Sequence, residues 1–402
     1  MNTSRTPDAL RPLGGFERII DLYISRNPVQ FSLAVELASP VSPEQLEQAL
    51  AELQALHPLL MVRIDRDGDR AVFRRIHAPI PVRHVRDSDW QTEAATEQTR
   101  PIDPMSGPLA RATLITEGGP TRAPFVLLTF SHQISDGRGA LLAVHDLLAL
   151  LAGRTRRART MPDAQEDHLQ RLPAAPPPAA GDQPADQVTP EHAALRPFDA
   201  TPPSIDGAEL DEPTTGHLRA AARENGSTVQ GVLCAAAALE LRDVMASTQI
   251  RINVPIDLRP LLGLDDAVVN RFVATTVTLR AAADDDLWSL ARSASAQLRS
   301  ARDRAAESIA MLASLHPGDA AEAEAAILAA TAADLEITNL GVSRDDGSDA
   351  PAIWGPTMTT QVVGERILGV LTHAGRLRLT LTTHEQIGTL VTGIARRMTS
   401  AI

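Results

Sequence analysis

The sequence predicts a mixed α/β (α+β) protein of two lobes, each a mixed sheet with helices. Its 402 residues exceed one ordinary core and correspond to roughly two or three domains. Strand and helix periodicities alternate in both halves of the chain. Between them, residues 161–200 are rich in Pro, Ala and Asp and carry almost no large apolar side chain. We therefore expect an N-terminal lobe over 1–160, an interdomain linker over 161–200 and a C-terminal lobe over 201–402.

The composition narrows the possible function classes. Hydrophobic residues make up 44% of the chain and aromatic residues only 3%, so aliphatic side chains must supply most of the buried surface. With 38 basic against 50 acidic residues the formal charge is -12, which argues against nucleic acid or anionic lipid as a partner. The single cysteine, Cys234, lies in an apolar helical stretch and excludes an intrachain disulfide framework.

No segment has the pattern of a secretion signal or of a membrane span. The N-terminus lacks the apolar core of a signal peptide. No window reaches the roughly 18 uninterrupted apolar residues that a transmembrane helix needs. We therefore expect a cytoplasmic protein.

The N-terminal half begins with a strand over residues 29–38. A helix follows, because Ser42 is a good N-cap, Pro43 suits the first helical position, and leucines recur behind them at helical spacing. Residues 60–76 alternate in polarity around Asp67–Asp69, which predicts a β-hairpin.

The stretch "FVLLTFSHQISDGRGALLAVHDLLALL", residues 125–151, joins a strand to a helix. The apolar run up to residue 130 is a buried strand by its composition, and from Gly137 onward leucines recur at helical spacing. Residues 131–136 therefore form the turn between them. Such turns expose polar side chains on a rigid scaffold, where catalytic groups are often found.

The C-terminal half repeats the mixture of helices and strands. We expect two helices joined around Asn225 and Gly226, the second capped at Ser227; strands over 249–260 and 271–281; an Ala-rich helical region over 284–333; a hairpin over 366–386 around Ala374–Gly375; and a helix over 386–400. Two lobes of this kind leave a possible cleft between them, and such clefts are common ligand sites.

His132 is the candidate general base of the turn. Imidazole is the group whose ordinary pKa lets it remove a proton near neutral pH, although an isolated histidine is more often a packing residue. Ser135, His132 and Asp136 have the composition of a nucleophilic triad. Neighbours within four residues seldom reach that geometry, and no G-x-S-x-G elbow surrounds Ser131 or Ser135. We therefore discount the triad.

Asp136 has three possible roles: it caps the following helix, orients His132 or pairs with a distant arginine. A metal site at His132 and Asp136 needs more ligands than this spacing supplies, and His145 is interpreted as a helix-surface or packing residue. No metal is therefore expected. Gly137 and Gly139 allow a close approach of the backbone.

The motif "SHQISDG" resembles the His-x-x-x-Asp-Gly motif of the chloramphenicol acetyltransferase-like superfamily, which includes condensation domains of nonribosomal peptide synthetases. "LGGFERIIDLYISRNPVQFSLAVEL" resembles the opening of the stand-alone polyketide-associated acyltransferases, the group of the dimycocerosyl transferases. The segments "ALHPLLMVRI", "INVPIDLRP", "ITNLGVSR" and "GVLTHAGRLRLTLT" follow in that group's order and approximate spacing. The resemblance covers nearly the whole chain apart from the linker.

The resemblance implies two lobes that enclose a tunnel with His132 at their junction. It implies that His132 accepts the proton of the acceptor, that Asp136 forms a salt bridge with Arg259, and that Gly137 and Asn339 support the site. Asn339 would donate a hydrogen bond during attack on the thioester. Most condensation domains carry a second histidine where this chain has Ser131, and the Asp-Phe-Gly-Trp-Gly segment of the plant acyltransferases is absent.

The resemblance implies acyl transfer from a carrier-protein or coenzyme A thioester to a hydroxyl group, in secondary metabolism. The donor would be carried on phosphopantetheine, and neither a tightly bound cofactor nor a covalent acyl-enzyme is expected. An amide-forming condensation enzyme and a non-catalytic scaffold that binds carrier proteins are the alternatives. The arginine run over 154–159 is either a docking patch for an acidic carrier protein or, more simply, a solvated part of the linker.

Overall fold

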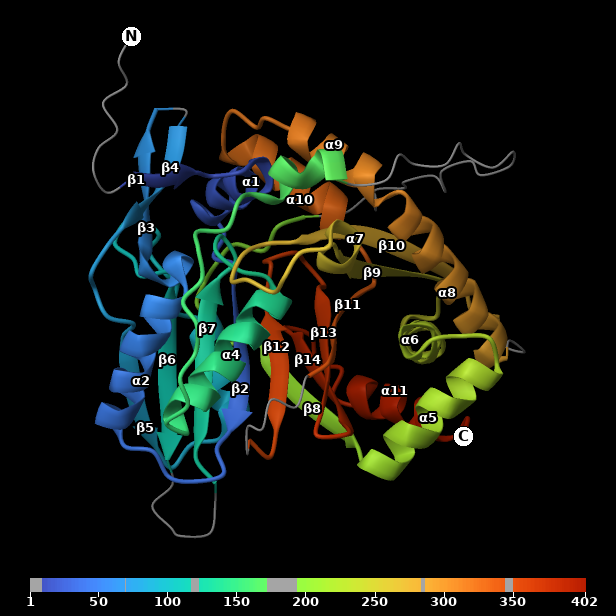
Figure 1. The fold of residues 1–402 in the computed structure, drawn as a ribbon. Coiled ribbons are helices and arrows are strands. Elements are labelled where there is room, and N and C mark those ends of the chain that lie inside the picture. The colour runs from blue at the N-terminus through green and yellow to red at the C-terminus, as the bar shows by residue number, and fades with distance from the viewer. Residues whose placement is uncertain (1–8, 69, 117–122, 172–193, 283–285, 344–349) are drawn as a thin grey trace.

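The computed structural model describes residues 9–68, 70–116, 123–171, 194–282, 286–343 and 350–402, which form two large sheets and one small sheet with helices (Figure 1). The N-terminal half carries helices α1 (Gly15–Ile24), α2 (Pro43–Leu56), α3 (Trp90–Gln98) and α4 (Gly137–Leu151). Its strands are β1 (Ala9–Pro12), β2 (Gln30–Glu36), β3 (Val62–Asp67), β4 (Arg70–Arg75), β5 (Val82–Arg86), β6 (Ala110–Thr116) and β7 (Phe125–Ser131). The predicted mixed α/β class is confirmed.

The first large sheet has the order β12-β2-β7-β6-β5 and therefore includes one strand from the far end of the chain. Strand β12 (Ile353–Met358) pairs antiparallel with β2. Helices α2 and α4 cover one face of this sheet and α3 packs on the other. A small separate sheet, β1-β4-β3, lies beside it. The exchange of β12 ties the two halves together, which the division of the sequence at residues 161–200 did not anticipate.

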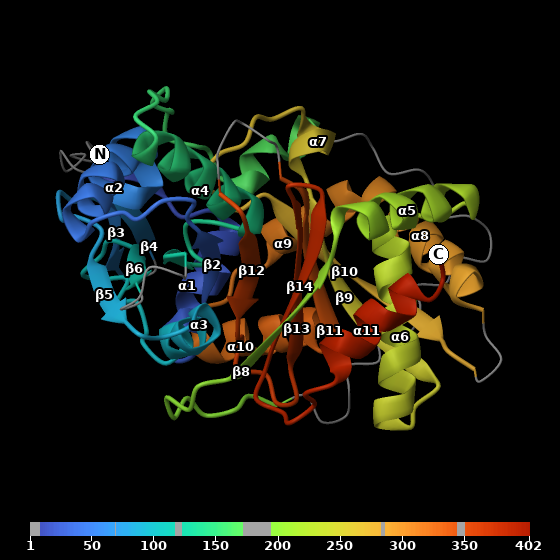
Figure 2. The same ribbon diagram turned by 90° about the horizontal axis from the view of Figure 1, so that it is seen from below.

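The second large sheet has the order β10-β9-β11-β13-β14-β8. Its strands are β8 (Ser204–Leu210), β9 (Gln249–Asp257), β10 (Phe272–Arg280), β11 (Leu335–Val342), β13 (Arg366–His373) and β14 (Arg376–Thr383). Figure 2 shows α5 (Glu212–Glu224), α6 (Val229–Met245) and α11 (Leu390–Thr399) on the side that faces away from the first sheet. With α8 (Leu287–Asp303) they bury the aliphatic core of this half. The opposite face looks toward the first sheet.

Most local predictions agree with the structure. Ser42 accepts a hydrogen bond from the Gln45 amide with Pro43 behind it, and the hairpin between β13 and β14 turns at Ala374–Gly375. Of the other hairpin, Asp69 lies outside the described residues, while β3 and β4 pair as expected.

Three boundaries differ from the predictions. Helix α6 is capped by Thr228, which accepts from the Gly231 amide, whereas the hydroxyl of Ser227 hydrogen-bonds to that of Ser295 instead. The Ala-rich region forms three helices, α8, α9 (Ala305–Ser314) and α10 (Ala320–Thr331), and the side chain of Asp319 caps the start of the last one. Helix α11 begins at Leu390 rather than near residue 386.

The predicted linker is anchored where the structure describes it. Residues Gln165–Arg171 form a short 3₁₀ helix, and both Gln165 and His168 are buried. Glu166 accepts a hydrogen bond from the Phe16 amide at the start of α1. The rest of the predicted linker, residues 172–193, lies outside the described residues. A very short α7 (Arg259–Leu262) completes the helices of the described chain.

Candidate active site

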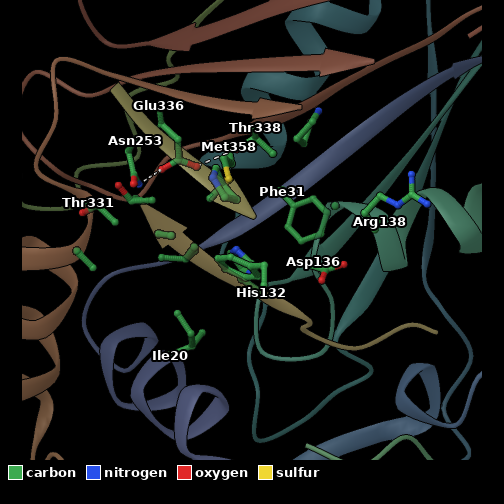
Figure 3. A pocket seen from close by; sticks show the side chains of 18 of the residues that line it. Ile20, Phe31, His132, Asp136, Arg138, Asn253, Thr331, Glu336, Thr338 and Met358 are labelled. Atoms are coloured by element: carbon green, nitrogen blue, oxygen red, sulfur yellow. Dashed lines mark hydrogen bonds between the residues drawn. The ribbon is translucent and has the colours of Figure 1, made fainter. Parts of the chain in front are cut away.

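A pocket lies between the two large sheets and is lined by both halves of the chain. It encloses about 1070 Å³ of space, including solvent at its open side. Helices α1 and α10, the turn before α4, and strands β9, β10, β11 and β12 all contribute side chains. Figure 3 shows His132 and Phe31 toward the middle, with Arg138 on one side and Glu336 and Asn253 on the other. The predicted turn at residues 131–136 thus lies at a cavity between the two lobes.

His132 stands in the turn between β7 and α4, as the periodicity of the sequence predicted. Its Nδ1 lies 3.0 Å from the carbonyl oxygen of Ser135. A carbonyl can only accept, so Nδ1 carries the proton and the neutral ring presents the lone pair of Nε2. No described side chain hydrogen-bonds to Nε2. The imidazole is therefore held in the tautomer that a general base requires.

Three of the chain's seven phenylalanines surround the ring of His132. Phe272 stacks on it with ring centroids 5.7 Å apart, while Phe31 and Phe16 meet it edge-on at 5.4 Å and 6.5 Å. Burial lowers the pKa of His132 below its ordinary value, and the nearby charge of Asp136 only partly opposes this effect. The ring is therefore neutral and available as a base at neutral pH.

Asp136 serves as both a helix cap and an ion-pair partner. It accepts from the Gly139 amide at 2.8 Å as the N-cap of α4. Arg259 donates to both of its carboxylate oxygens, at 2.9 and 3.0 Å, and the Arg271 amide donates at 2.8 Å. Asp136 makes no direct hydrogen bond to His132, so two of its three possible roles are occupied in the structure.

The Asp136–Arg259 pair is deeply buried, with 5% and 2% of the two residues exposed. Burial favours the neutral form of Asp136, but the charge of Arg259 and the hydrogen bonds outweigh burial, so the pKa of Asp136 is lowered. Because Arg259 begins α7 in the second lobe, this pair connects the motif turn to the other half of the molecule. A surface position for Arg259 is thereby excluded.

Neither serine of the motif is placed to act as a nucleophile. The Ser135 hydroxyl donates to the carbonyl oxygen of Asp136, and that of Ser131 donates to the side chain of Gln133. Neither hydroxyl hydrogen-bonds to His132. The structure therefore agrees with the rejection of a compressed Ser-His-Asp triad.

Gly137 and Asn339 both line the pocket. A side chain at Gly137 would collide with Leu340 of β11, so glycine allows helix α4 to approach that strand closely. The amide of Asn339 donates to Gln230 Oε1 at 2.8 Å, and its oxygen accepts from the Gly341 amide at 2.8 Å. These bonds fix the orientation of Asn339, and its contact with a reacting oxygen stays a prediction.

The segment before β10 supports the motif turn, and the sequence analysis did not identify it. Asn270 donates its side-chain amide to the carbonyl oxygen of His132 at 2.8 Å. Arg271 donates its backbone amide to Asp136, and Phe272 stacks on His132. The available signal was a polar Asn-Arg pair that follows an apolar run and stands at the start of a predicted strand. Nothing in its spacing connects it to a histidine 138 residues earlier.

Within the described ranges, no group of three or more His, Cys, Asp or Glu side chains is arranged to hold a metal ion. No helix in the same ranges is long and apolar enough to span a bilayer.

Residues 200–345 match the family model described as phthiocerol/phthiodiolone dimycocerosyl transferase C-terminus. One of the plipastatin synthase polypeptides of Bacillus subtilis (strain 168) is 28% identical over 257 residues, which cover 57% of this chain and 10% of the relative. The chain thus spans about a tenth of the length of that curated relative.

Solved structures share the fold over nearly the whole chain. Polyketide synthase associated protein 5 from Mycobacterium tuberculosis is similar with a TM-score of 0.64 at 17% identity, covering 98% of both chains. The TRI3 trichothecene 15-O-acetyltransferase from Fusarium sporotrichioides has a TM-score of 0.66 at 13% identity, with 97% of this chain and 95% of that chain covered. At these identities the likeness shows a common fold.

Proposed function

We propose that the chain is a member of the chloramphenicol acetyltransferase-like superfamily and transfers an acyl group from a thioester to a hydroxyl acceptor. The observation that carries the proposal is the state of His132. Its Nδ1 lies against a carbonyl oxygen, its Nε2 has no hydrogen-bond partner among the described residues, and burial lowers its pKa in a pocket built by both lobes.

In the proposed reaction, Nε2 of His132 accepts the proton of the acceptor hydroxyl as its oxygen attacks the thioester carbonyl. The carbon–sulfur bond then breaks, and the leaving thiolate takes the proton from the imidazolium. Asn339 donates a hydrogen bond to the oxyanion in this scheme. The histidine ends in its starting state, and no covalent acyl-enzyme forms.

The donor in this proposal is an acyl group on the phosphopantetheine of a carrier protein or on coenzyme A, with no tightly bound cofactor. The match of residues 200–345 to a dimycocerosyl transferase family model and the O-acetyltransferase among the structural neighbours support an ester product. On the same likeness we assign the proposed reaction to secondary metabolism.

Amide formation is the second candidate function. It is favoured by the 28% identity to a plipastatin synthase polypeptide and by the fold shared with the first condensation domain of the CDA synthetase, since an amide-forming condensation enzyme is the alternative that the sequence resemblance implies. The same base would serve an amine nucleophile. Whether the product is an ester or an amide decides between the two candidate functions.

The test is mass spectrometry of products after mixing the protein with acyl thioesters, on coenzyme A and on a carrier protein, and with matched alcohol and amine acceptors. We expect an ester that is absent when His132 is replaced by alanine, because a general base contributes about 10²- to 10⁴-fold. His217→Ala, on the exposed side of α5, is the control and should leave turnover unchanged. Near-normal turnover by a folded His132→Ala protein would refute the role of His132, and an amide product alone would select the second function.

A further inference from the structure

Strand β11 places a carboxyl group in an otherwise largely apolar pocket. Glu336 and Thr338 line the pocket, while Leu335 and Ile337, which alternate with them along the strand, are fully buried. The hydroxyl of Thr338 donates to Glu336 Oε1 at 2.9 Å, and the Asn253 amide donates to Oε2 at 3.1 Å. We call Glu336, Thr338 and Asn253 the carboxyl end of the pocket. Figure 3 shows this end on the opposite side of His132 from Arg138.

No basic side chain of the described residues forms an ion pair with Glu336. Burial accordingly raises the pKa of Glu336 above its ordinary value. A second carboxyl group, Glu365, is also buried and lies close enough for its charge to interact with that of Glu336. Glu365 is held by the amide and hydroxyl of Thr360 and by the amide of Gln361. Two buried carboxyl groups thus lie near each other, Glu336 in the pocket lining and Glu365 behind it, and no basic side chain of the described residues forms an ion pair with either.

Asn253 supplies an independent sign of a missing ligand. Only 2% of this residue is exposed and it lines the pocket. Its Oδ1 atom is buried and has no hydrogen-bond partner in the described chain, while its amide nitrogen is committed to Glu336. A buried acceptor without a donor is costly, by about 1–3 kcal/mol in general. The carboxyl end therefore offers hydrogen-bond acceptors on two side chains, and one of them, Asn253 Oδ1, has no donor among the described residues.

We propose that the carboxyl end binds an ammonium group on the acceptor, remote from the hydroxyl that His132 deprotonates. This inference rests on the proposed function and makes the acceptor an amino alcohol. An ammonium group has three N–H donors, which can serve the free lone pairs of Glu336 and the oxygen of Asn253. A neutral hydroxyl would need only an amide acceptor, so it gives no reason to bury an uncompensated carboxylate.

Binding of acceptors without any thioester tests the inference. The probes are straight-chain amino alcohols of increasing length, with the alkanols and diols of equal length, measured by calorimetry on the full-length protein. At one length the amino alcohol should bind about 10- to 100-fold more tightly than its alkanol, the range of a hydrogen bond to a charged group. Glu336→Gln should remove this preference while the alkanol affinity stays the same.

Glu324→Gln is the matched control for the loss of one negative charge. Glu324 lies on α10, a helix that contributes to the pocket, but its carboxylate binds Asn27 and does not line the cavity. This variant should keep the preference for the amino alcohol. Equal affinities of all probes in the unmodified protein would overturn the inference even if Glu336→Gln failed to fold. A diol that binds as tightly as the amino alcohol would overturn the ammonium assignment.

The outcomes separate this inference from the proposed function. A preference for the amino alcohol without transfer from any thioester would sink the proposed function alone. Transfer to simple alcohols without any preference for an amino group would sink the inference alone. His132→Ala should bind the amino alcohol with unchanged preference, because the carboxyl end is intact in that variant.

Discussion

Helix α4 is associated with two histidine–aspartate combinations that are built in opposite ways. At its start, His132 and Asp136 do not hydrogen-bond to each other, because Asp136 is taken by Arg259. Ten residues farther along, Asp146 bonds directly to His57 Nε2 at 2.9 Å. His57 is 1% exposed and lies outside the pocket, whereas His132 lines it.

The difference shows what makes a histidine available as a base. In the His57–Asp146 combination the carboxylate is hydrogen-bonded to the Nε2 atom of the ring. Arg156 and Arg159 lie 3.2 and 3.4 Å from the same carboxylate. In the first, an arginine from the other lobe neutralises the aspartate and leaves Nε2 of the histidine free. These contacts also engage two arginines of the 154–159 run, so the run is not simply a solvated stretch. Its docking of a carrier protein stays a prediction.

Replacement of Asp136 by alanine should have the largest effect on stability. It would leave Arg259 buried without its bidentate partner, and breaking a buried pair in this way costs about 3–5 kcal/mol of unfolding free energy. Asp257→Ala removes the other close partner of Arg259, at 3.0 Å, which is more exposed and should cost about 1 kcal/mol or less. Urea denaturation of both variants measures the difference. Equal losses would contradict the dominance of the Asp136 pair.

His57→Ala should reduce stability and spare turnover. Asp146 would lose the donor at Oδ2 while keeping its arginines, so we expect a loss of about 1–3 kcal/mol. The turnover number of the folded fraction should change only a few-fold, in contrast to His132→Ala. The two measurements are urea denaturation and acyl transfer below the unfolding midpoint. A large loss of turnover in folded His57→Ala would erase the distinction between the two histidines.

The pH dependence of acyl transfer should give the smallest but most direct contrast. Protonation of His132 abolishes its function as a base, and burial lowers its pKa, so kcat/KM should fall only at pH values below about 6.5, the ordinary value for histidine. The His57→Ala variant should show the same fall of kcat/KM at low pH. A fall of kcat/KM with a midpoint above the ordinary pKa of histidine would mean that His132 is not the group whose protonation limits the reaction.

Local features of the fold were readable from the sequence because each depends on neighbours along the chain. The turn at residues 131–136 follows from a change of hydrophobic period, and the cap at Ser42 follows from the residues that directly succeed it. The cap of α6 was misplaced by one residue, since Ser227 and Thr228 are both good caps. In the structure the hydroxyl of Thr228 accepts from the Gly231 amide, and both residues also contact Ser295 of α8.

The candidate site was only partly predictable, because many of its contacts join residues that are far apart in the sequence. The sequence pointed to His132 by its chemistry, and the resemblance to known acyltransferases supplied Arg259 as a partner for Asp136. Asn270 and Phe272 contact His132 across more than a hundred residues, and no periodicity encodes such a distance. The predicted linker shows the opposite error. Its composition predicted a solvent-exposed segment, whereas Gln165 is buried in the structure.

By itself the sequence determined a two-lobed α/β protein with a polar turn that presents one histidine. The tertiary structure decided that burial lowers the pKa of this histidine, that its Nε2 has no hydrogen-bond partner among the described residues, and that three phenyl rings surround it. It also decided that Glu336 faces the same cavity without a described counterion. The physical reason is that helices, turns and caps depend on adjacent residues, whereas burial, tautomer and charge pairing depend on what the fold brings together from elsewhere.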